Sequence, residues 1–132
     1  MSYIVPFSTI QKMIGGTPRN GGPPRAVSVD AIKEVIRLLL RSVPVDEAWY
    51  RGRYEDVAAA IKAGMYRSAK HHFVEEGYFE GRLPAAQQID ERWYIRQNQD
   101  VAEGLRNGDF ASAQEHFLKF GYQEGRAPAE MW

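Results

Sequence analysis

Hydrophobic and polar residues recur along this chain with the spacing of α-helices, and no segment shows the alternation that is typical of a β-strand. The clearest pattern is "SVDAIKEVIRLLLRSV", which begins at Ser28. Ser28 is a suitable N-cap, and charged residues line the side opposite a wide apolar stripe. The stripe predicts an interaction helix, which would pack on the rest of the chain or pair with a second copy. Its central residues are Ile32, Val35, Ile36 and Leu39.

An internal repeat follows this helix. Residues 45–84 align with residues 89–128 at a constant offset of 44, without a gap, and 18 of the 40 aligned pairs are identical. A fixed period is typical of folds in which neighbouring copies of one unit stack and share a core. We therefore expect that neither copy buries its aromatic side chains alone, and that the two copies pack face to face or in tandem.

Each copy predicts about three short helices. In the first copy, Asp46 is the expected N-cap of the first helix, Gly64 ends the second, and Ser68 lies near the start of the third. Gly77 is expected to end the third helix, with the following tyrosine in the apolar contact that often accompanies such an ending. The equivalent residues of the second copy are Asp90, Gly108, Ser112 and Gly121.

The predicted fold class is all-α, with two tandem homologous units of about three short helices. They span residues 45–88 and 89–132. An amphipathic helix (28–44) precedes them, and before it lie an N-terminal arm and a Gly/Pro-rich linker (1–27). The apolar start of the arm is a candidate binding peptide or exchange arm, because the linker separates it from the rest.

Charge and composition narrow the classes of function. The net charge is zero, but residues 1–44 carry about +4, residues 45–88 about −1 and residues 89–132 about −3. Such a distribution favours contact between a basic head and an acidic body, unless salt screens it. The near-neutral chain makes nucleic acid an unlikely partner. No cysteine is present, and neither a Sec signal nor a membrane span is expected, so we expect a cytoplasmic protein.

Two histidines, His72 and His116, are candidates for chemistry because both lie on the predicted inner face of the third helix, beside phenylalanine. A metal site needs three or four ligands, whereas the chain has three histidines and no cysteine. We expect neither metal nor cofactor and assign no catalytic residue. The favoured role is structural, with the imidazole bonded to a backbone carbonyl or a carboxylate. Ligand binding and catalysis remain alternatives.

Arg82 and Arg126 lie in a repeated Glu-Gly-Arg signature. A guanidinium can hold a sugar or a carboxylate ligand with two parallel hydrogen bonds. It can also lock a turn, by bonding helix-terminal carbonyls or by pairing with Asp56 or Asp100. Recurrence in both copies favours the second interpretation, because a fold signature must recur whereas a single binding site need not.

Four aromatic residues, Trp49, Tyr50, Trp93 and Tyr94, are candidates for a sugar-stacking platform or a protein-binding surface. At helical spacing in a small domain such residues more often belong to the core. Of the two types, we expect tyrosine to present its hydroxyl end to solvent.

The repeated elements "WY", "DVA", "SA..HF" and "GY.EGR.P" resemble short bacterial repeats that are found beside glycosyltransferase or polysaccharide-biosynthesis modules and in some large surface proteins. The likeness covers about two thirds of the chain. The proline that usually precedes Asp-Val in these repeats is replaced by Glu55 and Gln99. The resemblance implies a bacterial accessory module without a catalytic site, in polysaccharide biosynthesis or secretion.

The sequence therefore favours a non-enzymatic interaction or scaffold module that self-associates or docks on a larger bacterial assembly. Its partner would be another protein or a second copy of the chain. The alternative is a regulatory domain that binds a carbohydrate or another small ligand through the repeated aromatic, histidine and arginine residues. A small enzyme that uses His72 or His116 is the third and least favoured hypothesis.

Overall fold

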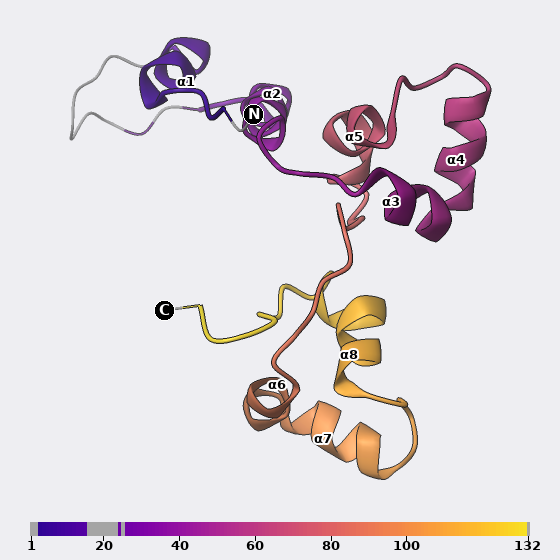
Figure 1. Cartoon of the computed structure of the whole chain (residues 1–132). Helices are drawn as coiled ribbons and strands as arrows, with labels where there is room; N and C mark the ends of the chain where they lie inside the picture. The colour runs from indigo at the N-terminus through magenta and orange to yellow at the C-terminus, as the bar shows by residue number, and fades with distance from the viewer. Residues whose placement is uncertain (1–2, 16–23, 25, 132) are drawn as a thin grey trace. The chain divides into compact units, whose positions relative to one another are not determined.

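A computed structural model describes residues 3–15, 24 and 26–131 of the chain. All regular structure in this part is helical, as the sequence predicted, and no strand occurs among these residues (Figure 1). Most of the predicted Gly/Pro-rich linker (16–23 and 25) lies outside the described residues. The chain divides into two compact units, residues 1–85 and 86–132.

The first unit contains five helices and a π-helical turn that continues the fifth. They are α1 (Phe7–Met13), α2 (Val29–Leu40), α3 (Glu47–Arg53), α4 (Glu55–Lys62), α5 (Ala69–His72) and η1 (Phe73–Gly77). The second unit repeats the last four elements. They are α6 (Glu91–Gln97), α7 (Gln99–Arg106), α8 (Ala113–His116) and η2 (Phe117–Gly121). Within the described residues, no helix combines the length and the apolar character needed to cross a bilayer.

The helices begin where the sequence predicted. The Asp46 carboxylate accepts a hydrogen bond from the backbone N–H of Trp49 at 3.0 Å, and the Ser68 hydroxyl accepts one from the N–H of His71 at 3.0 Å. Ser28 caps α2 through the N–H of Ala31 at 3.1 Å. In the second unit, Asp90 and Ser112 make the equivalent bonds. Each cap satisfies a backbone donor that the helix itself leaves unpaired.

Gly64 ends α4 as predicted. Its φ is +81°, a conformation that glycine adopts without strain. Its N–H bonds to the carbonyl of Ile61, and the next N–H, of Met65, reaches back to Ala60, both at 3.0 Å. This pair of bonds is a Schellman ending. Gly108 has a φ of +79° and ends α7 in the same way.

The helical segments η1 and η2 end at Gly77 and Gly121, where the sequence predicted an end, but the Schellman ending expected there lies further along the chain. The N–H of Tyr78 bonds to the carbonyl of Phe73 at 2.9 Å, a π-helical bond, and Tyr78 itself has helical angles. The Schellman ending lies at Gly81, whose φ is +79°. Gly77 has a second role, a close side-chain approach that is described below.

Each unit has its own hydrophobic core. The first is built around Tyr50, Val57 and Phe73. The equivalent residues of the second are Tyr94, Val101 and Phe117. All six are at most 2 % exposed. The expectation that neither copy buries its aromatic residues alone is therefore wrong, because every buried member of each cluster comes from that cluster's own unit.

Helix α2 packs within its own unit, which was one of the two predicted outcomes. Leu40 is 7 % exposed in the first core, and Ile36 and Val43 pack against that core. Arg37 strengthens the contact, since its Nη2 donates to the backbone carbonyl of Glu75 at 3.2 Å. Helix α1 contacts α2 and has no buried residue of its own.

Candidate functional site

The most buried polar group of each unit is a tyrosine–histidine pair. The Tyr50 hydroxyl, on α3, lies 2.9 Å from Nδ1 of His72, on α5. Tyr94 and His116 make the same contact, also at 2.9 Å, in the second unit. Both tyrosines are 0 % exposed, and the histidines are 5 % and 4 % exposed. Each pair joins the first and third helices of its copy of the repeat, α3 to α5 and α6 to α8.

The partner of these histidines differs from the prediction. The sequence led us to expect a backbone carbonyl or a carboxylate, whereas the shared partner is a tyrosine hydroxyl. Among the described residues, a histidine of such a pair has a carboxylate within ion-pair distance in the first unit alone, where Nε2 of His72 lies 3.5 Å from Oε1 of Glu80.

Gly77 and Gly121 make room for the pairs. A Cβ atom at Gly77 would overlap the Tyr50 hydroxyl, and one at Gly121 would overlap the Tyr94 hydroxyl. The π-helical turn brings the glycine backbone against the end of the tyrosine side chain, where only a missing side chain leaves space. The three residues therefore act as one structural cluster in each copy.

Burial keeps both pairs uncharged. Removal from water lowers the pKa of His72 and of His116 below the ordinary value, because the imidazolium loses hydration. The same loss raises the pKa of the Tyr50 and Tyr94 hydroxyls. A neutral, enclosed pair has no contact with a surface ligand, so its geometry fits the structural role rather than acid–base catalysis.

Arg82 and Arg126 hold their units together through aspartate, which the sequence analysis favoured. Arg82 donates two parallel bonds to Asp56, at 2.9 and 2.7 Å, and Arg126 makes two of the same lengths to Asp100. The hydrogen bonds from arginine lower the pKa of both aspartates to about 2. The Arg82 guanidinium also lies over the Tyr54 ring, 4.9 Å from its centroid. Both guanidiniums are therefore already bound to carboxylates of the chain itself.

Of the four candidate aromatic residues, the tyrosines lie inside and the tryptophans at the edge. The expectation that tyrosine shows its hydroxyl to solvent is wrong, because that hydroxyl bonds to the buried histidine. Trp49 and Trp93 are half-buried and pack against the two cores. A role for the four residues in sugar binding stays a prediction, and only the tryptophans have accessible surface to support it.

The interaction helix is buried at its C-terminal end and exposed at its N-terminal end. Ile36 packs on the core, and Val35 and Leu39 are half-buried. Ile32, one turn before Ile36 on the same face of the helix, is 46 % exposed. Among the residues that the structure describes, no group of three or more His, Asp or Glu side chains is arranged to hold a metal ion.

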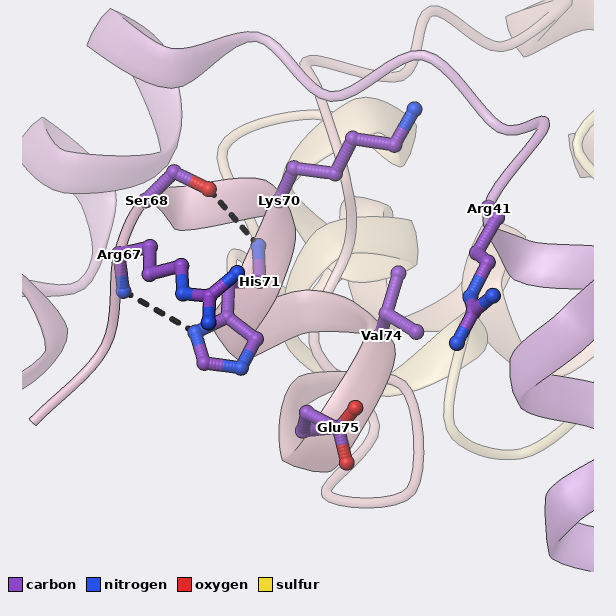
Figure 2. Close-up of a pocket in the computed structure, with 7 residues that line it drawn as sticks. All are labelled: Arg41, Arg67, Ser68, Lys70, His71, Val74 and Glu75. Atoms are coloured by element: carbon purple, nitrogen blue, oxygen red, sulfur yellow. Dashed lines mark hydrogen bonds between the residues drawn. The ribbon is translucent and has the colours of Figure 1, made fainter.

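Sequence reasoning missed one hollow in the first unit (Figure 2). Residues from the end of α2 and from α5 line it, and four of them are basic: Arg41, Arg67, Lys70 and His71. A signal was present in the repeat alignment, because the last three have no basic equivalent in the second copy. The fourth, Arg41, joins them only through the packing of α2.

Comparisons of the chain with protein-family models, with curated proteins and with solved structures found no match. The likeness to bacterial repeats therefore stays a prediction from the sequence.

Proposed function

We propose that this chain is a non-enzymatic interaction module, built from two copies of one helical unit, which associates with a second copy of itself. Helix α1 and the exposed N-terminal end of α2 would form the contact surface. An accessory role in bacterial polysaccharide biosynthesis or secretion rests on the sequence resemblance alone.

The polar residues that recur in the repeat already have hydrogen-bond partners within the chain, in both copies. The tyrosine–histidine pairs and the arginine–aspartate pairs recur with the same partners and nearly the same distances. A group that makes the same paired contact in each copy maintains the fold. This pattern supports an interaction module over an enzyme that uses either histidine.

The observation that carries the proposal is the exposed apolar surface at the N-terminal end. Tyr3, Ile4 and Phe7 are 66, 65 and 66 % exposed, and they lie at or just before α1. On α2, Val29 and Ile32 are 67 and 46 % exposed. Single exposed apolar residues are ordinary, but several on neighbouring elements are typical of an interaction surface.

Charge and the difference between the two units favour a second copy as the partner. Residues 1–44 carry about +4, while residues 89–132 carry about −3. In the first unit α2 helps to bury Val74, but its equivalent Leu118 is only half-buried and nearby Phe120 is 48 % exposed. The second unit has no preceding helix of its own to cover this face. The basic segment 1–44 of another copy matches the acidic second unit in charge, and the exposed apolar residues on α1 and α2 match this face in apolarity.

The test is the absolute mass of the full chain by light scattering, over a concentration series and at low and high salt. Self-association predicts a mass above 15.0 kDa that rises with concentration. High salt should lower it, because salt screens attraction between exposed charges. A mass of one chain at every concentration and both salt levels contradicts the proposal.

A further inference from the structure

The open hollow beside α5 has a volume of about 400 Å³. That volume lies within the range of small-molecule sites. Arg41, just after α2, lies on one side of it and Arg67 and His71 on the other, Lys70 extends away from His71, and Val74 adds an apolar surface (Figure 2). The hollow is formed entirely within the first unit.

The positive charges in this hollow lack partners. Among the described residues, none lies within hydrogen-bond or ion-pair distance of the charged ends of Arg41, Arg67 and Lys70. The single acid of the lining is Glu75, and its carboxylate already lies 3.6 Å from Nε of Arg37. Three cations without a partner therefore line one hollow, and a bound anion would reduce the repulsion between them.

Two further groups that line the hollow each have a hydrogen that is available for a hydrogen bond to a ligand. Nδ1 of His71 accepts a hydrogen bond from the backbone N–H of Arg67 at 3.0 Å. The neutral imidazole therefore carries its proton on Nε2, as a donor. The Ser68 oxygen accepts the N–H of His71 at 3.0 Å, which leaves the hydroxyl hydrogen free to bond elsewhere.

The second copy of the repeat shows that the fold does not need these charges. At the positions of Arg67, Lys70 and His71, it has Ala111, Gln114 and Glu115. Glu115 accepts the N–H of Ala111 at 2.9 Å, so it performs the same backbone role as His71. The backbone N–H therefore requires only a hydrogen-bond acceptor at this position. The fold does not explain why the first copy has basic residues here.

We propose that this hollow binds a phosphate group carried by a small molecule. Two guanidiniums and an ammonium match a phosphate dianion better than a single carboxylate, and arginine favours the bidentate geometry that phosphate offers. The space exceeds a single phosphate ion, and Val74 would contact the organic part of the ligand. Because Arg41 follows α2 and the other donors lie on α5 or just before it, the ligand would also tie these two elements together.

The test is titration calorimetry of the full chain with glycerol 3-phosphate and, separately, with inorganic phosphate, at constant ionic strength. The decisive variant is Arg67→Ala/Lys70→Gln/His71→Glu, which installs the residues of the second copy and so preserves the local backbone bond. Circular dichroism checks that it folds. The control, Arg53→Ala/Lys62→Gln/Arg92→Ala, removes three positive charges from exposed positions outside the hollow.

The proposal predicts saturable binding of glycerol 3-phosphate, loss of at least tenfold in affinity in the decisive variant, and a change below twofold in the control. Tighter binding of glycerol 3-phosphate than of inorganic phosphate would show that the hollow also contacts the organic part of the ligand. Equal affinity would show that the phosphate ion alone accounts for the binding. The absence of saturable binding for both probes overturns the proposal. An equal loss of affinity in both variants also overturns the proposal, because it would indicate only a general attraction of the anion to the positive charge of the chain.

Discussion

The Tyr50 hydroxyl lies 2.9 Å from Nδ1 of His72, although 22 positions separate the two residues. The contact joins α3 to α5 and recurs between Tyr94 and His116 at the same separation. Each pair lies against a glycine that has no side chain to block it. This cluster explains why the repeat conserves a tyrosine, a histidine and a glycine between its two copies.

Replacement of Gly77 by alanine should destabilise the first unit. The added methyl group would overlap the Tyr50 hydroxyl, and overpacking of this kind typically costs about 1–3 kcal/mol. Gly52→Ala is the matched control, because it adds the same methyl group to α3 with no atom within 4 Å, and should stabilise by about 0.5–1 kcal/mol. Urea unfolding measures both. A Gly77→Ala chain as stable as the Gly52→Ala chain would show that the close approach is not needed.

The buried histidines should make the protein less stable as the pH falls from 7 to 5. Burial lowers the pKa of His72 and His116 from the ordinary 6.5, so below pH 6.5 the unfolded chain binds more protons than the folded chain. Stability therefore rises with pH in this range and is lost as the pH falls toward the folded-state pKa.

Urea unfolding at several pH values measures this slope. The double variant His72→Gln/His116→Gln should be less stable than the natural chain at pH 7 but show a flatter dependence between pH 7 and 5. An unchanged slope in the double variant would assign the pH dependence to other groups.

The two ends of α2 should respond differently to truncation. Leu40→Ala removes a side chain that is 7 % exposed in the first core and should cost about 2–5 kcal/mol in unfolding free energy. Ile32→Ala acts near the N-terminal end, where the residue is 46 % exposed, and should cost well under half of that. Thermal unfolding compares them. Similar losses for the two variants would mean that Ile32 belongs to the core.

Local sequence signals predicted the helix starts well. Asp46, Ser68 and Ser28 each cap the helix that follows, because a cap depends on residues only three positions away. The pairing of Arg82 with Asp56 was also predictable, since recurrence in both copies indicated a structural bond.

The errors arose where distant parts of the chain meet. Gly77 was expected to carry a Schellman ending, but that ending lies at Gly81, and Gly77 instead makes room for Tyr50 on another helix. The burial of the tyrosine hydroxyls was missed because their partner histidines lie 22 positions away. The basic hollow depends on Arg41 from α2 lying near α5, which no local pattern predicts.

The most direct test of the proposed self-association is the light-scattering mass of three full-length chains at one high concentration: natural, Phe7→Asp and Met65→Asp. Both substitutions place a carboxylate at a highly exposed apolar residue, 66 % and 68 % exposed, but only Phe7 lies on α1. The proposal predicts a multiple of 15.0 kDa for the natural and Met65→Asp chains, and 15.0 kDa for Phe7→Asp. Equal masses for all three chains would contradict an association surface on α1.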